Sequence, residues 1–113
     1  MTTPIGNNAI LVLTNLPDIN SAEKLAQNLI TAQLVACVNI LAPCTSMYQW
    51  QDKLEKTTEV PMMIKASRDH YPEIEAAILK HHPYELPEII FIGIDGGLPD
   101  YLAWVTSMTA NTT

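Results

Sequence analysis

The chain has 113 residues, the usual length of one domain, and 48% of them are apolar, which is enough to form a buried core. Its formal net charge is −6, with six lysines and arginines against twelve aspartates and glutamates, so it lacks the basic surface that nucleic-acid binding requires. Its longest apolar runs are far shorter than the roughly 20 residues of a membrane-spanning helix. We therefore expect neither a nucleic-acid partner nor a membrane partner.

The N-terminal residues and the cysteines bear on the compartment. Residues 1–8 lack a positive segment followed by an apolar stretch and a cleavage site, so we see no secretory signal and expect a flexible N-terminal segment. Cys37 and Cys44 match neither a disulfide framework nor a CxxC metal motif. We therefore expect two free thiols in a cytoplasmic protein.

The first predicted elements are a strand and a helix. Residues 9–13 are apolar on both faces and precede Pro17, which is typical of a central buried strand. Apolar residues then recur at helical spacing, which predicts an amphipathic helix over 19–32. Either Asp18 or Asn20 can serve as its N-cap.

A long hairpin occupies the middle of the chain. A second strand is predicted over 34–41, and Pro43 interrupts it because proline removes a donor from the strand ladder. Strand chemistry resumes over 45–50, residues 51–52 form a plausible turn, and alternating apolar and polar residues over 54–66 predict the returning strand.

The length of this hairpin needs an explanation. Its arms exceed the usual five or six residues of a strand, and a small sheet cannot cover strands that project beyond it. Exposed strand edges invite pairing with another chain. We therefore predict that the hairpin extends into an oligomer interface.

The last third of the chain is predicted to hold two helices and a strand. Asp69 can cap a helix that ends at His82, ahead of Pro83. A buried strand over 89–94 follows, and a last helix begins at Pro99.

The order of these elements is β-α-β-β-α-β plus a terminal helix. It is the split βαβ arrangement of ferredoxin-like folds, an α+β class with an antiparallel four-stranded sheet and both main helices on one face. We place this domain at residues 9–108 and expect a polar tail at 109–113.

Two adjacent histidines at the end of the second helix are the best candidates for metal ligands. Neutral imidazole, as in His81 and His82, suits copper, zinc and nickel. Adjacent helical residues point about 100° apart, so both rarely bind one ion within a chain. The alternative is structural, because a histidine in the last helical turn interacts favourably with the helix dipole.

A series of motifs runs along residues 9–106. In chain order they are Ala36-Cys37-Val38-Asn39-Ile40, Ser46-x-Tyr48-x-Trp50, Glu59, Lys65, His82-Pro83-Tyr84-Glu85-x-Pro87-Glu88 and Tyr101-Leu102-x-Trp104. Their order and spacing resemble those of the CutA family, the divalent-cation tolerance proteins. The resemblance implies a ferredoxin-like homotrimer in which long hairpins pair between subunits, as in the PII signalling proteins. The family usually has glycine at the position of Asp52, a residue that also tolerates turn conformations.

The resemblance also implies two candidate sites. Cys37 is similar to the family's thiol and, together with Glu59 and a histidine, can form a metal site; the alternative is an inert buried cysteine.

The second candidate site is a cleft between subunits. A lysine, a carboxylate, a phenol and an indole converging there can hold a small polar anion; these are Lys65, Glu88, Tyr84 and Trp50. The alternative for this group is a structural ion pair beside a satisfied tyrosine hydroxyl.

Several functions stay open at this point. The first is a homotrimer that binds copper or other divalent metal ions weakly, with no obligatory cofactor, in metal homeostasis. The second is a PII-like sensor with a small-molecule effector in the cleft, and the third is a trimeric scaffold. The sequence contains no Gly-rich phosphate loop, GxSxG elbow or HExxH motif, so we expect no enzymatic activity.

Overall fold

The computed structural model describes residues 8–108. The predicted polar tail at 109–113, and all of the predicted N-terminal segment except Asn8, lie outside these residues. The elements, in chain order, are β1 (Ala9–Leu16), α1 (Ile19–Thr31), β2 (Cys37–Ile40), β3 (Cys44–Trp50), β4 (Lys53–Ser67), the 3-10 turn η1 (Arg68–His70), α2 (Tyr71–His81), β5 (Ile89–Gly93) and α3 (Pro99–Ser107). None of the described helices is long and apolar enough to cross a membrane.

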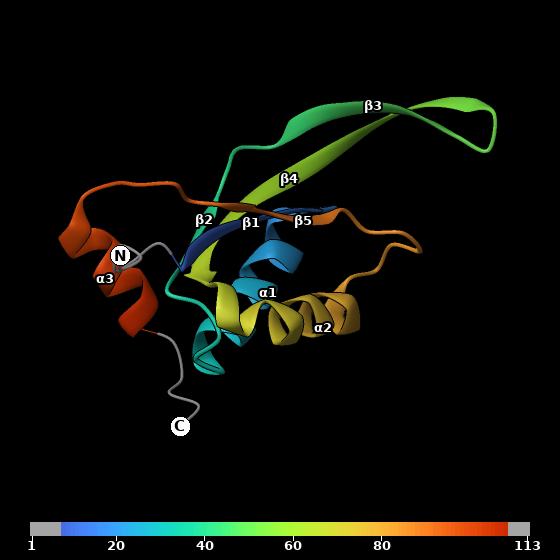
Figure 1. The fold of residues 1–113 in the computed structure, drawn as a ribbon. Helices are drawn as coiled ribbons and strands as arrows, with labels where there is room; N and C mark the ends of the chain where they lie inside the picture. The colour runs from blue at the N-terminus through green and yellow to red at the C-terminus, as the bar shows by residue number, and fades with distance from the viewer. Residues whose placement is uncertain (1–7, 109–113) are drawn as a thin grey trace.

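The sheet has the predicted ferredoxin-like topology. Its strands follow the order β2-β4-β1-β5 and all neighbours are antiparallel, while β3 pairs with the part of β4 that extends beyond the sheet. Helices α1 and α2 cover one face, which we call the inner face (Figure 1). The expected α+β class and helix placement are therefore confirmed.

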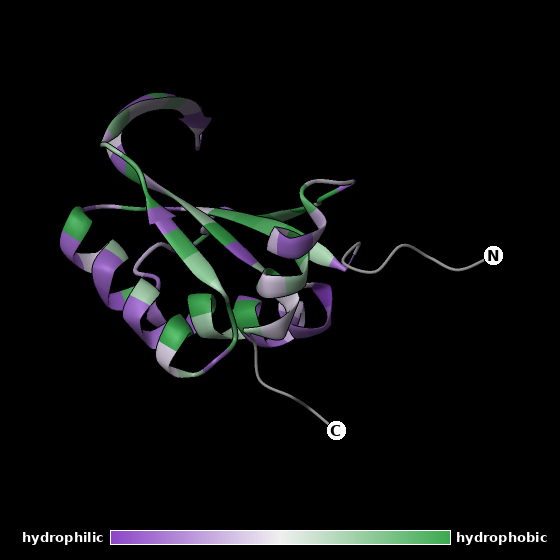
Figure 2. Ribbon diagram, turned by 90° about the vertical axis from the view of Figure 1, so that its left-hand side faces the viewer, coloured by the Kyte–Doolittle hydropathy of each residue, from purple (hydrophilic) through white to green (hydrophobic). Residues whose placement is uncertain are grey.

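Helix α1 forms because its apolar residues make one stripe and its N-terminus is capped. The buried residues Ala22, Leu25, Ala26 and Leu29 face the sheet, and the apolar side of the helix is visible in Figure 2. Of the two expected caps the structure uses Asp18, whose Oδ1 accepts a hydrogen bond from the Ser21 amide at 2.7 Å. This hydrogen bond lowers the pKa of Asp18.

Strand β2 is shorter than predicted, starting at Cys37 rather than at residue 34. Gln33 has a positive φ of 60°, and the amide of Leu34 donates to the Leu29 carbonyl at 3.1 Å. This closure of the α1 C-terminus is of the Schellman type and uses Leu34, the first residue that the apolar pattern assigned to the strand.

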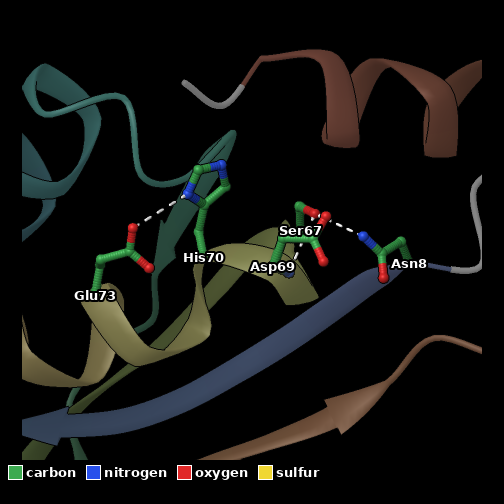
Figure 3. Close-up of polar contacts among 5 residues, drawn as sticks. All are labelled: Asn8, Ser67, Asp69, His70 and Glu73. Carbon is green, nitrogen blue, oxygen red and sulfur yellow. Dashed lines mark hydrogen bonds and ion pairs between the residues drawn. The ribbon is translucent and has the colours of Figure 1, made fainter. Parts of the chain in front are cut away.

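The expected cap of the second helix is also wrong. Asp69 lies inside the 3-10 turn η1, and the N-cap position of α2 is His70, which makes no capping hydrogen bond with its side chain. Ser67 caps η1 instead: its Oγ accepts from the Asp69 amide at 3.4 Å and from Asn8 Nδ2 at 3.0 Å (Figure 3). Ser67 is the last residue of β4 and has an extended backbone. Its hydroxyl therefore caps the 3-10 turn that lies between β4 and α2. Helix α2 then begins at Tyr71, with a proline in its first turn and His70 Nδ1 3.9 Å from Glu73 Oε2.

The face of the sheet opposite α1 and α2, the outer face, is apolar and only partly covered. Because side chains alternate along a strand, Leu11 and Leu13 of β1 share this face with their partners Ile92 and Ile90 of β5. These two isoleucines are 53% and 48% exposed. Within the described residues, α3 packs only on one end of this face, around Ala9.

The hairpin of β3 and β4 projects well beyond the sheet (Figure 1). The molecule measures 51 × 28 × 23 Å and its radius of gyration is 15.2 Å, against roughly 13 Å for a compact domain of this size. At the tip, Gln51 and Asp52 have φ values of 52° and 67°, which fit the two central positions of a type I′ turn. The predicted long hairpin and its turn are confirmed.

The left-handed conformation of Asp52 gives a test of the turn. Asp52→Val should lower the free energy of unfolding by about 1–2 kcal/mol, because a β-branched side chain clashes with the backbone at positive φ. Urea unfolding at one fixed protein concentration measures the change. Asp52→Gly is the control and should not destabilise; equal losses in both variants would contradict the turn assignment.

Candidate functional site

A cleft of about 940 Å³ lies between the hairpin and the turn that leads from α2 to β5. One wall comes from β3 and β4, and the other from residues 83–88, with Asn15 of β1 at the base. Its lining residues are Asn15, Ser46, Met47, Tyr48, Trp50, Glu55, Thr57, Glu59, Pro83, Tyr84, Glu85, Leu86 and Glu88. It therefore brings together Trp50, Tyr84 and Glu88 of the predicted cleft group.

His82 holds the turn wall in place. Its ring is buried, with Nε2 2.6 Å from the Asn15 carbonyl oxygen and Nδ1 3.2 Å from the Tyr84 amide. The Tyr84 amide can only donate and the carbonyl can only accept, so the ring carries its proton on Nε2 and accepts at Nδ1. Both nitrogens are occupied by structural hydrogen bonds, and neither is directed at a vacant ligand position.

Tyr84 and Glu59 connect the two walls. Burial, followed by a hydrogen bond from the Tyr84 hydroxyl to the Glu59 carboxylate and the charge of that carboxylate, raises the pKa of Tyr84 to about 12. The ring also packs on His82, with centroids 4.6 Å apart. Glu59 itself is 7% exposed, so this hydrogen bond compensates in part for the burial of a carboxylate.

The hairpin wall follows from strand register. Tyr48 pairs with Glu55, and Ser46 pairs with Thr57. Directly paired residues share one face of an antiparallel ladder, so the aromatic and acidic side chains are set side by side. Thr57 Oγ1 is buried on this wall and has no hydrogen-bond partner among the described residues.

Lys65 lies apart from the rest of the predicted cleft group. It pairs with Leu11 of β1, and its Nζ is 5.7 Å from the ring centroid of Tyr101 in α3. Glu88 instead accepts a hydrogen bond from Asn15 Nδ2 at 3.0 Å. Asn15 is four residues beyond Leu11 along β1, a distance of roughly 13 Å. Within one chain, Lys65 therefore lies at the end of the sheet that is opposite to Glu88 and the cleft.

The predicted metal ligands are also dispersed in one chain. His81 is exposed, with Nε2 3.4 Å from Asn28 Nδ2. Cys37 pairs with Lys65 of β4. Lys65 is six residues from Glu59 along this strand, a distance of roughly 20 Å. Between residues 8 and 108, no three His, Cys, Asp or Glu side chains are grouped so that they could hold a metal ion. Both cysteines are free thiols.

Some cleft residues were not found from the sequence. Glu55 and Thr57 lie on the same strand face as Glu59, and the residues between them are exposed on the other face. The alternation along this strand was therefore a signal for them. Ser46 stands in the motif with Tyr48 and Trp50, which share its strand face. Asn15 had no signal, because its place in the cleft depends on contacts between distant segments.

Comparisons with known proteins agree with one another. A family model described as CutA1 divalent ion tolerance protein matches residues 10–108. The divalent-cation tolerance protein CutA of Yersinia pestis (strain Pestoides F) is 40% identical over 101 residues, which cover 89% of this chain and 85% of that protein. The crystal structure of CutA1 from the psychrotrophic bacterium Shewanella sp. SIB1 is 38% identical, with a TM-score of 0.89 over 92% of this chain and 97% of that one.

A third relative comes from an archaeon. The structure of the periplasmic divalent cation tolerance protein CutA from Archaeoglobus fulgidus is 31% identical, with a TM-score of 0.85, and the match covers 88% of this chain and 97% of that one. At this identity and coverage, the likeness extends to the whole described fold.

The two hydrogen bonds of His82 predict a structural role that can be measured. His82→Ala should lower the free energy of unfolding by about 2–3 kcal/mol, because it leaves the Asn15 carbonyl and the Tyr84 amide without their partner. Urea denaturation at neutral pH measures it. His81→Ala is the control and should change stability by less than about 0.5 kcal/mol; equal effects would contradict the assignment.

Proposed function

Because the chain belongs to the CutA1 divalent ion tolerance protein family, we propose that it binds copper(II) and other divalent cations weakly and serves metal homeostasis without catalysing a reaction. The observation that carries this proposal is the match of the family model to residues 10–108, nearly the whole described chain. The net charge of −6 supports it, since an acidic protein attracts cations.

Weak binding, rather than a resident metal, is what the arrangement of side chains favours. No three-ligand group occurs within residues 8–108 of one chain, and both nitrogens of His82 are engaged. A preformed cage within one subunit therefore does not fit. An exposed imidazole such as His81 can bind a cation with water as the other ligands, and Cys37 and Glu59 stay candidates for ligands shared between subunits.

We also propose that the protein is a homotrimer. The uncovered apolar outer face, with Ile90 and Ile92 about half exposed, supports burial against another copy. Strand β5 is an edge strand, and the β3–β4 hairpin presents a further unpaired edge. These features favour association of identical chains through strand edges and the outer face.

The cytoplasm is the location that we propose. Support comes from the free thiols of Cys37 and Cys44, which suit a reducing compartment. The Archaeoglobus relative is described as periplasmic, so immunodetection in cytoplasmic and periplasmic fractions would separate the two locations.

The metal proposal is tested by anaerobic calorimetric titration with copper(II) and zinc. His81→Ala should raise the copper Kd at least about tenfold, since it removes an imidazole ligand. Lys80→Ala, an exposed neighbour without a ligand group, should leave it unchanged. Cys37→Ser tests the thiol in the same way. Unchanged stoichiometry and affinity in all of these variants would refute a role for these ligands.

The trimer proposal is tested by light scattering on the purified protein. The expected mass is three times the 12.5 kDa of one chain. Ile92→Asp should shift the population towards smaller species, because it places a charge on the apolar outer face. Leu79→Asp, an exposed change on α2, is the control. A monomeric mass for the unmodified protein would overturn the proposal.

A further inference from the structure

The apolar outer face of the sheet carries opposite charges at its two ends. Strand register puts Lys65 in one row with Leu11 and Ile92, at the end where α3 packs. Glu88 lies at the other end, where its Oε1 accepts a hydrogen bond from Asn15 Nδ2 at 3.0 Å. Asn15 is four positions beyond Leu11 on the same face of β1, so roughly 13 Å separate the two ends. The two charged groups therefore stay apart within one chain.

Lys65 has no carboxylate partner in its own chain. Its Nζ is 5.7 Å from the ring centroid of Tyr101, and it forms no ion pair with any carboxylate of residues 8–108. Among the described residues that the paired strands β1, β2, β4 and β5 place on the outer face, only Lys65 is charged. The rest of this face is apolar or uncharged.

Burial of the outer face against another copy makes this unpaired charge costly. Such a contact takes the Lys65 ammonium group out of water, and a buried ammonium group without a negative partner is strongly unfavourable. A second copy can supply the partner through Glu88. This side chain is exposed, and its Oε2 accepts no hydrogen bond from the described residues.

The separation of the charges favours a contact that joins unlike ends of the outer face. Like ends brought together would place lysine opposite lysine and glutamate opposite glutamate, which is repulsive. A head-to-tail contact is heterologous, and it closes into a ring when the rotation between neighbours permits. A trimer is such a ring. An antiparallel twofold dimer also joins unlike ends, and the mass in solution separates the two.

We propose that Lys65 of each subunit forms an ion pair with Glu88 of a neighbouring subunit, across the apolar surface between them. The inference rests on the proposed association of identical chains and adds the charged pair that sets the relative direction of neighbouring subunits. The structural ion pair that the sequence left open for these two residues would then hold between two chains rather than within one.

The first test reverses the two charges and follows dissociation of the oligomer in urea by light scattering. Lys65→Glu and Glu88→Lys should each raise the apparent dissociation constant at least about tenfold, because each places like charges opposite one another. The double variant should recover most of this loss, since it restores an attractive pair. Lys65→Glu combined with Glu23→Lys has the same net charge, but its second change lies on the exposed side of α1 and should recover nothing.

A second test uses the unmodified protein, so it does not depend on a variant that fails to fold. A carbodiimide joins an amine to a carboxylate that touches it, with loss of water. It should link Lys65 to Glu88 in covalently joined subunits, as identified by mass spectrometry of the peptides. Lys65→Arg is the control, because it keeps the positive charge but cannot be coupled in this way. This variant should retain the oligomer and lose the cross-link.

The possible results separate this proposal from the trimer proposal. A double variant as weak as the single ones, equal recovery by Glu23→Lys, or a cross-link from Lys65 to a different residue would overturn the ion pair. A trimeric mass of the unmodified protein would then still support the trimer. A dimeric mass with the Lys65–Glu88 cross-link would overturn the trimer alone, and a monomeric mass would overturn both.

Discussion

Strand β4 is the element on which the rest of the structure depends, because it pairs with β1, β2 and β3 along its 15 residues. Its C-terminal part supplies Met62 and Ile64 to the core beneath α1 and α2. Its N-terminal part leaves the sheet and becomes one arm of the hairpin. Side chains alternate between the two faces along the whole strand. The face that bears Lys65 over the sheet therefore also bears Glu59 and Thr57, which line the cleft. The fold and the candidate site are therefore set by one register.

The junction between α2 and β5 is best understood as a structural clamp. The two hydrogen bonds of His82 fix the turn between the helix end and the strand start, and this turn presents Tyr84, Glu85 and Glu88 to the hairpin wall. A histidine that is committed in this way is a poor ligand for a mobile ion. The chain can belong to a divalent ion tolerance family although His82 has a structural role. Cations can bind weakly at exposed groups or between subunits instead.

The sequence by itself determined the ferredoxin-like order of elements, the long hairpin and its turn, because hydrophobic periodicity and turn residues act over a few positions. It also indicated that Trp50, Tyr84 and Glu88 belong to one site. Only the tertiary structure decided that Ser67 caps a 3-10 turn ahead of α2, that His82 is held by Asn15, and that Lys65 is separated from Glu88. Each of these depends on contacts between segments that are far apart in the sequence, such as Asn8 with Ser67 and Asn15 with His82, and local patterns do not specify such contacts.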